Sequence, residues 1–218
     1  MRAGAPVVVK LGGSLMAGAD LDALLDRVID AVRPVVIVCG GGLFADAVRA
    51  AQGRLGFSDG LAHRLALDAM SQFAAVIAER RPQLALCNSL QAIAMAFERD
   101  RQALWHPVAL RDGHPAIPET WAVTSDSLAL FVAREIAAAA VILVKSADPA
   151  AAAAATAQPD GSGPAVLRLV AAGHLDAAFP AFLAGGSGIV RILGPADHDR
   201  LGAAIAAPEG DIGFDPLG

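Results

Sequence analysis

The sequence has few cysteines, few charged residues and no long apolar run, and each scarcity excludes a class of protein. Its two cysteines, Cys39 and Cys87, are too few for a disulfide framework or a structural zinc site. Charged residues make up 18% of the 218 residues and hydrophobic residues 55%, which excludes disorder for most of the chain. No apolar run approaches the roughly 18 residues of a membrane span, and the N-terminus lacks the apolar core of a secretory signal. We therefore expect a soluble, cytoplasmic protein.

The charge balance narrows the partners that we expect. The 17 basic and 22 acidic residues give a net charge of −5, which argues against a broad nucleic-acid surface but allows a local basic pocket. We expect a small-molecule partner, and neither a nucleic acid nor a membrane. The high apolar fraction also favours a homodimer or a higher homo-oligomer, since two-fold pairing is the commonest soluble assembly.

Lysine is almost missing from the basic residues. Only Lys10 and Lys145 are lysine, and the other 15 are arginine. An Ala- and Arg-rich chain is typical of a coding bias that replaces lysine wherever arginine serves. The two remaining lysines are therefore candidates for positions that need a compact ammonium rather than a planar guanidinium. Chance survival is the plain alternative.

Apolar runs alternate with amphipathic stretches along the whole chain. Runs rich in β-branched residues and bounded by glycine or proline predict strands, and apolar residues at helical spacing predict helices. The predicted strands cover residues 6–11, 35–38, 84–86, 141–144 and 189–193. The predicted helices cover residues 20–33, 42–51, 61–80, 90–99, 126–138, 166–172 and 196–206. We expect residues 104–124 to be irregular and residues 147–164, rich in Ala, Pro and Gly, to form an exposed loop.

This alternation is typical of an α/β protein. Because the predicted strands are apolar on both faces, we expect a three-layer αβα sandwich with a mostly parallel central sheet, in a single domain over residues 1–218. Ligands of such sheets lie beyond the carboxyl ends of the strands. Three predicted strands end near Lys10, Gly40 and Lys145, so these segments are expected to meet at one edge.

Glycine-rich turns follow the first two predicted strands. Glycines let backbone N–H groups approach a phosphate, a following helix N-terminus adds partial positive charge, and Lys10 would add a full charge. Neither turn matches a Walker loop or a dinucleotide fingerprint, and a plain strand-to-helix turn is the alternative at both places. The candidate anion-binding residues are Lys10, Gly12, Gly13, Ser14, Gly40, Gly41 and Gly42.

Two further segments carry polar side chains at the ends of predicted elements. Thr124, Ser125 and Asp126 lie at a helix start, where capping is the plain interpretation. The alternative is that Asp126 positions the two lysines or a metal-bound nucleotide. Lys145-Ser-Ala-Asp148 ends an apolar strand, where a lysine is costly unless it is solvated, paired or facing a site.

The histidines give a weaker signal. His63 lies on the long predicted helix, where a satisfied or solvated side chain is commoner than a ligand. The other histidines lie in or near turns and indicate little: His106, His114, His174 and His198.

Together these motifs resemble the amino acid kinase family, the fold of acetylglutamate, aspartate, carbamate and uridylate kinases, over nearly the whole chain. The resemblance implies a kinase that uses ATP with Mg²⁺ carried by the nucleotide rather than by a protein site. It also implies that Lys10, Asp126 and Lys145 form the catalytic centre. The implied phosphate-binding residues are Gly12, Gly13, Ser14, Ser146 and Asp148. The implied acceptor-binding residues are Gly40, Gly41, Gly42, His63, Thr124 and Ser125.

Within this family, three features are similar to the branch that serves methanofuran biosynthesis. They are Ala62-His63 before a long helix, the segment from Trp121 to Ala129, and the lysine in the strand-end segment. Members of this branch phosphorylate [5-(aminomethyl)furan-3-yl]methyl phosphate to its diphosphate. The resemblance therefore implies a small phosphate acceptor.

The chain departs from the family pattern at two places. Pro149 stands where the strand-end segment usually has glycine. A later lysine of the family is missing, because residues 165–190 contain Arg168 as their one arginine or lysine. Lys145 is expected to take the role of that lysine.

Two other functions remain open from the sequence. One is a different small-acceptor kinase of the family, acting on a carboxylate or a nucleoside monophosphate. The other is a non-catalytic nucleotide- or oxyanion-binding protein on the same fold, which would bind ATP without releasing ADP.

Overall fold

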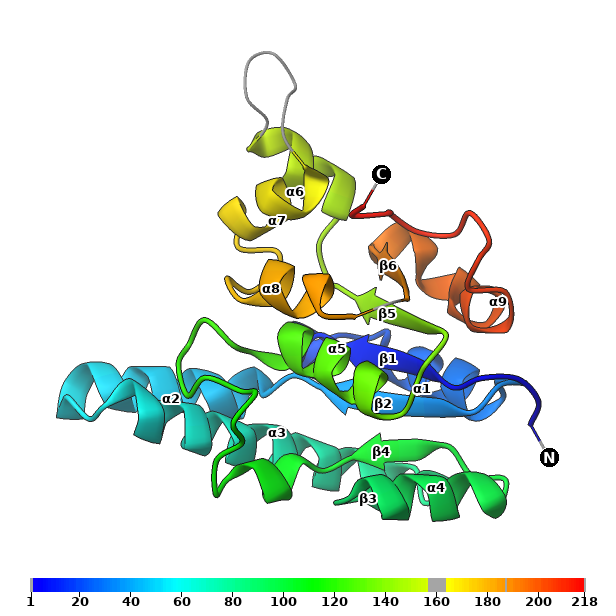
Figure 1. The fold of residues 1–218 in the computed structure, drawn as a ribbon, viewed down its shortest axis with the longest axis horizontal. Coiled ribbons are helices and arrows are strands. Elements are labelled where there is room, and N and C mark those ends of the chain that lie inside the picture. Colours follow the sequence, from blue (N-terminus) through cyan, green and yellow to red (C-terminus); the bar gives the residue numbers. More distant parts are fainter. Residues whose placement is uncertain (1, 157–163, 187, 218) are drawn as a thin grey trace.

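The computed structural model describes residues 2–156, 164–186 and 188–217, and this part of the chain contains a six-stranded sheet (Figure 1). All paired strands run parallel, in the order β3-β4-β2-β1-β5-β6. Strand β1 therefore lies between β2 and β5, and the parallel pairing agrees with the predicted sheet. The strands are β1 (Val7–Leu11), β2 (Val35–Cys39), β3 (Ala85–Cys87), β4 (Ala103–Trp105), β5 (Ala140–Val144) and β6 (Ile189–Leu193).

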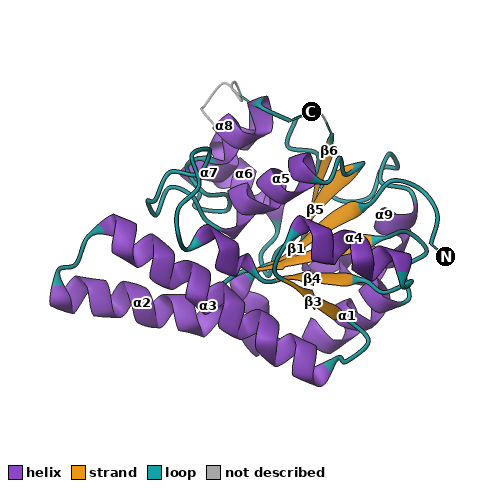
Figure 2. Cartoon of the chain, turned by 60° about the horizontal axis from the view of Figure 1, so that its bottom comes forward, coloured by secondary structure: helices purple, strands orange, loops and turns teal. Residues whose placement is uncertain are grey.

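Helices cover both faces of this sheet, which gives the three layers of the predicted αβα sandwich. One buried core joins the sheet to α4, α5, α6, α7 and α8, and the other joins it to α1 and α9, while α3 contributes to both. The pair α2 and α3 extends beyond the sheet (Figure 2). The helices are α1 (Leu21–Ile29), α2 (Gly42–Leu55), α3 (Asp59–Arg80), α4 (Leu90–Glu98), α5 (Ser125–Glu135), α6 (Pro149–Ala155), α7 (Ala165–Ala171), α8 (Phe179–Ala184) and α9 (Leu201–Ala206). Among the described helices, none combines the length and apolar character needed to cross a bilayer.

Strand alternation decides which side chains of β1 and β5 face α5. Successive side chains of a strand point to opposite faces. Val8 belongs to the α5 core, whereas its neighbours Val7 and Val9 belong to the α1 core. Lys10 is two residues past Val8, and Lys145 is two residues past Leu143 of the α5 core. The alternation therefore places both lysines on the α5 face of the sheet.

The glycine turns after β1 and β2 are in direct backbone contact. A Cβ on Gly13 would lie 2.5 Å from the backbone nitrogen of Gly42, and a Cβ on Gly40 would lie 2.5 Å from that of Gly13. Gly42 also adopts a φ of 50°, which costs glycine little but strains other residues. Glycine is thus required here because the two strand ends must touch.

Two predictions about the elements are wrong, and both concern short segments. The expected exposed loop over residues 147–164 contains α6, whose Pro149 and Ala153 are buried, while residues 157–163 lie outside the described residues. The expected irregular stretch 104–124 begins inside β4 and continues into a 3-10 turn at Pro107–Leu110. A three-residue strand is too short to show an alternation, and an alanine run has no apolar periodicity. Helix α8 was also missed, because its six residues make less than two helical turns and are too few to show a periodic pattern.

Replacing Gly13 by alanine tests the contact between the turns. The new Cβ would meet backbone atoms of Gly42, so the two turns would have to separate. We therefore expect the unfolding free energy to fall by about 1–3 kcal/mol, as at other overpacked sites. Urea unfolding measures this loss. The matched control is Gly53→Ala on α2, where nothing lies within 4 Å; alanine there is expected to stabilise by about 0.5–1 kcal/mol. Equal stability of Gly13→Ala and the parent chain would contradict the analysis.

Candidate active site

Two lysines share one carboxylate at the carboxyl edge of the sheet. Lys10 Nζ lies 2.8 Å from Asp126 Oδ1. Lys145 Nζ lies 2.7 Å from Asp126 Oδ2 and 2.8 Å from Oδ1. Lys10 belongs to β1, Lys145 directly follows β5, and Asp126 lies in the first turn of α5. The predicted convergence of these three residues, called the Lys–Asp–Lys cluster below, is confirmed.

The cluster is buried, and its charges shift the pKa values of its members. Only 4% of the surface of Lys10 and of Asp126 is exposed. Burial alone would raise the pKa of Asp126, but the ammonium groups of Lys10 and Lys145 outweigh it and hold the pKa at about 2. Burial, together with the positive charge of Lys10, lowers the pKa of Lys145 to about 8. At neutral pH the cluster therefore holds two positive charges and one negative charge.

The two ammonium groups differ in their free hydrogen-bonding capacity. An ammonium has three N–H donors. Lys145 contacts both oxygens of Asp126 and also donates to the backbone oxygen of His174 at 2.7 Å, so its capacity is used. Lys10 Nζ pairs with Asp126 and has no other hydrogen bond or ion pair within the described part of the chain. Lys10 is therefore the ammonium with donors available for a ligand.

Asp176, which the sequence analysis missed, fixes the start of α5. Its Oδ2 accepts hydrogen bonds from the backbone N–H of Thr124 at 2.9 Å and of Ser127 at 3.0 Å, and from the hydroxyl of Thr124 at 2.9 Å. The hydroxyl of Ser127 donates to Oδ1. A carboxylate remote in sequence thus satisfies N–H groups that a helix start leaves unpaired. It holds the turn that carries Asp126.

Two contacts fix the strand end that carries Lys145. The ring of His198 is buried and lies 2.9 Å from the backbone oxygen of Lys145 through Nε2 and 3.2 Å from Asp20 Oδ2 through Nδ1. The hydroxyls of Ser14 and Ser146 lie 2.7 Å apart, which links the first glycine turn to the same strand end. His198 thus has a structural role, although it gives little signal in the sequence. Its partners lie far away in the sequence, so no local pattern marks it.

A cavity of about 390 Å³ lies beside the cluster, between the glycine turns, α2, α3 and the start of α5. We call it the acceptor cavity, after the acceptor-binding residues that the sequence resemblance implies. Its polar and small lining residues include many of those expected at the site: Gly13, Ser14, Gly40, Gly41, Gly42, His63, Thr124 and Ser125. Gly12 lies next to Lys10, because a Cβ on Gly12 would be 3.9 Å from Lys10 Nζ. The cavity wall therefore includes the sequence neighbours of the cluster, Gly13 and Ser125, while Lys10 itself lies just behind the first glycine turn.

His63 belongs to the cavity wall rather than to a solvated helix face. Its side chain is buried, and Nδ1 lies 3.2 Å from the backbone oxygen of Thr120. A carbonyl oxygen only accepts, so Nδ1 carries the hydrogen. Burial lowers the pKa of His63. The neutral ring then leaves Nε2 as a hydrogen-bond acceptor.

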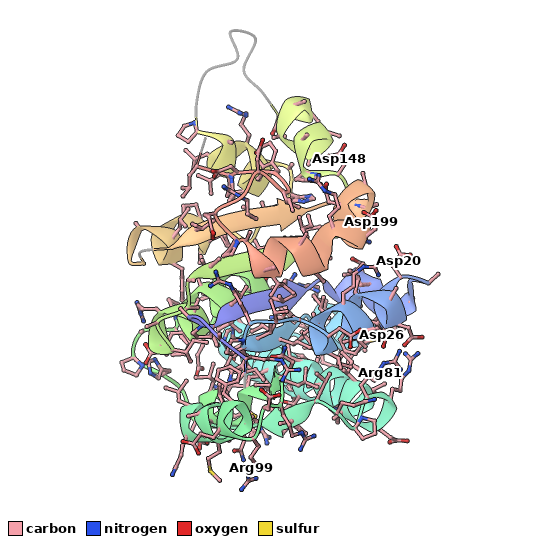
Figure 3. All side chains as sticks on the ribbon, turned by 90° about the vertical axis from the view of Figure 1, so that its right-hand side faces the viewer. Asp20, Asp26, Arg81, Arg99, Asp148 and Asp199 are labelled. Carbon is pink, nitrogen blue, oxygen red and sulfur yellow. The ribbon has the colours of Figure 1, made fainter. Side chains whose placement is uncertain are left out.

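Asp148 lies apart from the cavity wall. Its Oδ1 accepts the backbone N–H of Ala150 at 2.9 Å and so caps α6. In Figure 3, Asp148 appears on the same flank as Asp20 and Asp199. Asp20 and Asp199 line a smaller hollow together with His198. The structure thus separates Asp148 from the residues that line the acceptor cavity.

The charged and aromatic residues of the cavity wall that escaped the candidate set are Asp46, Arg49 and Trp121. Asp46 and Arg49 follow Gly42 on α2 by four and seven residues, which puts them on one helix face. Trp121 was part of a recognised segment but received no role. The sequence signal for Asp46 and Arg49 was their place on a helix that follows a glycine turn. This signal is weak, because charged residues on the solvated face of any helix look the same.

Comparisons with known proteins agree with this geometry. The amino acid kinase family model matches residues 5–149. A [5-(aminomethyl)furan-3-yl]methyl phosphate kinase of Methanocaldococcus jannaschii is 31% identical over 143 residues, which is 65% of this chain and 66% of that protein, just under two thirds of its length.

Solved structures share the fold at low sequence identity. The uridylate kinase of Archaeoglobus fulgidus superposes with a TM-score of 0.64 at 16% identity, over 95% of this chain and 97% of that one. The UMP kinase of Ureaplasma parvum gives 0.62 at 14% identity, over 90% and 92%. The family match covers the lysines, the glycine turns and Asp126, whose geometry has just been described. The chain belongs to the amino acid kinase family.

Proposed function

We propose that this protein is an ATP-dependent phosphotransferase that transfers a phosphoryl group to a small acceptor in the acceptor cavity. The observation that carries the proposal is the Lys–Asp–Lys cluster beside two touching glycine turns. Phosphoryl transfer depends mainly on positioning and on neutralising charge. The cluster offers one net positive charge, and the turns offer backbone N–H groups.

The residues present fit a polyphosphate on the Lys10 side of the site. Lys10 has free donors, Gly12 and Gly13 keep the backbone accessible, and Ser14 and Ser146 add hydroxyls. Mg²⁺ brought by ATP would supply further neutralisation of the phosphate charges. Asp126 then holds Lys10 in position, and Lys145 adds positive charge to the site. Lys145 does not bind the phosphates directly, since its donors are already used.

An acceptor that is itself a phosphate suits this site. Its oxygen is already ionised at neutral pH, so no general base is needed. The difficulty is the repulsion between two anions, which the ammonium groups and N–H groups oppose. A neutral acceptor hydroxyl would need a base next to the Lys–Asp–Lys cluster, and the carboxylate at that point, Asp126, is engaged by two lysines.

We infer that the acceptor is [5-(aminomethyl)furan-3-yl]methyl phosphate and the product its diphosphate. The support is the similarity to the M. jannaschii kinase of that name, together with a cavity of a size suited to one small molecule. The test is ADP release at fixed ATP and Mg²⁺ with this phosphate, UMP, acetylglutamate, aspartate and carbamate in turn. We expect turnover with the furan phosphate to exceed all others. Preferred turnover of UMP or a carboxylate, or ATP binding without ADP release, would contradict the inference.

Substitution of Lys10 tests its proposed contact with the transferred phosphoryl group. Lys10→Ala is expected to lower kcat by about 10²–10³, as for removal of one charge-stabilising donor. Lys10→Arg is expected to rescue little, because the planar guanidinium is larger and the buried position holds a compact ammonium. Steady-state kinetics, with thermal unfolding as the folding control, measures both. Near-normal kcat in Lys10→Arg would contradict both the role and its explanation.

The pH dependence tests the charge of the cluster. As the pH rises through about 8, Lys145 loses its proton and the cluster loses its net positive charge. We expect kcat/KM for ATP to fall above pH 8, whereas kcat holds to higher pH because bound phosphates favour the ammonium form. Lys145→Arg provides the matched variant, since its guanidinium does not titrate here. The expectation fails if kcat/KM of the parent enzyme is flat from neutral pH to well above 8.

A further inference from the structure

The acceptor cavity is electrically different at its two ends. The sheet-edge end is formed by the glycine turns, whose backbone N–H groups can donate, and the Lys10 ammonium lies next to Gly12. Farther out, Asp46 and Arg49 are the charged side chains among the described lining residues. They follow Gly42 by one and two helical turns, or about 6 and 10 Å along α2. The wall also has an apolar part, with Leu67, Met70, Val123 and Leu128.

Arg49 is held in place by its neighbours. Its guanidinium carbon lies 4.3 Å from the ring centre of Trp121. The indole N–H of Trp121 donates to Gln52 Oε1 at 2.6 Å, which fixes the ring. Arg49 therefore has a defined position on α2 rather than a freely moving side chain.

Asp46 keeps one unused oxygen. Its Oδ1 lies 3.3 Å from a guanidinium nitrogen of Arg49. Its Oδ2 has no hydrogen bond or ion pair within the described residues, and 68% of the side chain is exposed. Asp46 can therefore accept a hydrogen bond from a ligand without breaking its contact with Arg49.

His63 adds a second acceptor to the same cavity. Its Nδ1 is committed to the backbone oxygen of Thr120, which leaves Nε2 as the free nitrogen of a neutral ring. Two acceptors, one of them charged, suit a ligand group that donates several hydrogen bonds and carries positive charge. A primary ammonium has both properties.

We propose that Asp46 is the specificity-determining residue that binds a primary ammonium group of the acceptor, so that the substrate class is an amino-phosphate. This rests on the proposed function, because it takes the acceptor phosphate to lie at the glycine turns. A furan ring with an aminomethyl arm and a phosphomethyl arm has this chemistry: an anion at one end, a flat apolar centre and a cation at the other. An acceptor with a carboxylate at its far end would instead bring a second negative charge against Asp46.

The competing explanation is an ordinary ion pair on a helix surface. Asp46 and Arg49 are three residues apart, and such pairs are common on exposed helices. If that were the whole role of Asp46, its removal would not distinguish an acceptor with an amine from one without. The two explanations therefore predict different selectivities rather than different stabilities.

The test compares [5-(aminomethyl)furan-3-yl]methyl phosphate with its N-acetyl derivative, which keeps the ring and the phosphate but lacks the positive charge. Calorimetry in the presence of an unreactive ATP analogue gives the Kd of each. We expect the parent protein to bind the free amine about tenfold tighter or more, as for one charge-assisted hydrogen bond. Asp46→Asn is expected to lose this preference while binding the N-acetyl derivative as before, and Asp46→Glu to keep part of it.

Asp68→Asn is the matched control. Asp68 lies on α3, pairs with Arg111 at 2.8 Å and does not line the acceptor cavity. We expect this variant to keep the full preference for the amine.

Four outcomes would be decisive. Equal binding of both derivatives by the parent protein, or equal weakening of both by Asp46→Asn, would overturn the proposal. An Asp46-dependent preference for the amine without any turnover would support the amine site and contradict the phosphotransferase function. Turnover of the furan phosphate with no effect of Asp46→Asn would do the reverse.

Discussion

Two ammonium groups can be buried side by side only if an anion lies between them, and Asp126 provides that anion. An unpaired buried charge costs several kcal/mol, so each lysine depends on the carboxylate and the carboxylate depends on both lysines. The contact joins β1, β5 and α5 at one point of the sheet edge. The rest of the site is arranged around it. Asp176 holds the helix start, while His198 and His174 hold the strand end through backbone and side-chain contacts.

The same contact explains how a chain of net negative charge can attract polyphosphates. The overall charge of −5 would repel a nucleotide at long range. Inside the site, low local dielectric strengthens the field of the cluster, and its single excess positive charge is not shielded by solvent. The arginines do not provide this field, because most of those in the described ion pairs face surface carboxylates.

The centre of the site could be predicted because its residues lie at the ends of elements with clear patterns. Lys10 and Lys145 follow apolar strands, and Asp126 starts a helix, so the topology of a parallel sheet alone brings them together. Asp176 and His198 could not be predicted, since they act across long sequence separations from segments without periodicity. Asp46 looked like any charged helix residue until the cavity showed what it faces. In the fold, the short elements α6, α8 and β4 were missed because too few residues carry their pattern.

The position of β1 bears on the order in which this chain completes its fold during synthesis. β1 is made first but lies in the middle of the sheet, between β2 and β5. Its lysine stays without a carboxylate partner until α5 has been translated, more than half of the chain later. Asp176, which holds α5, follows later still. The N-terminal half therefore cannot close around Lys10 by itself, and a stalled ribosome would present an open glycine turn and an unneutralised ammonium to the cell's chaperones.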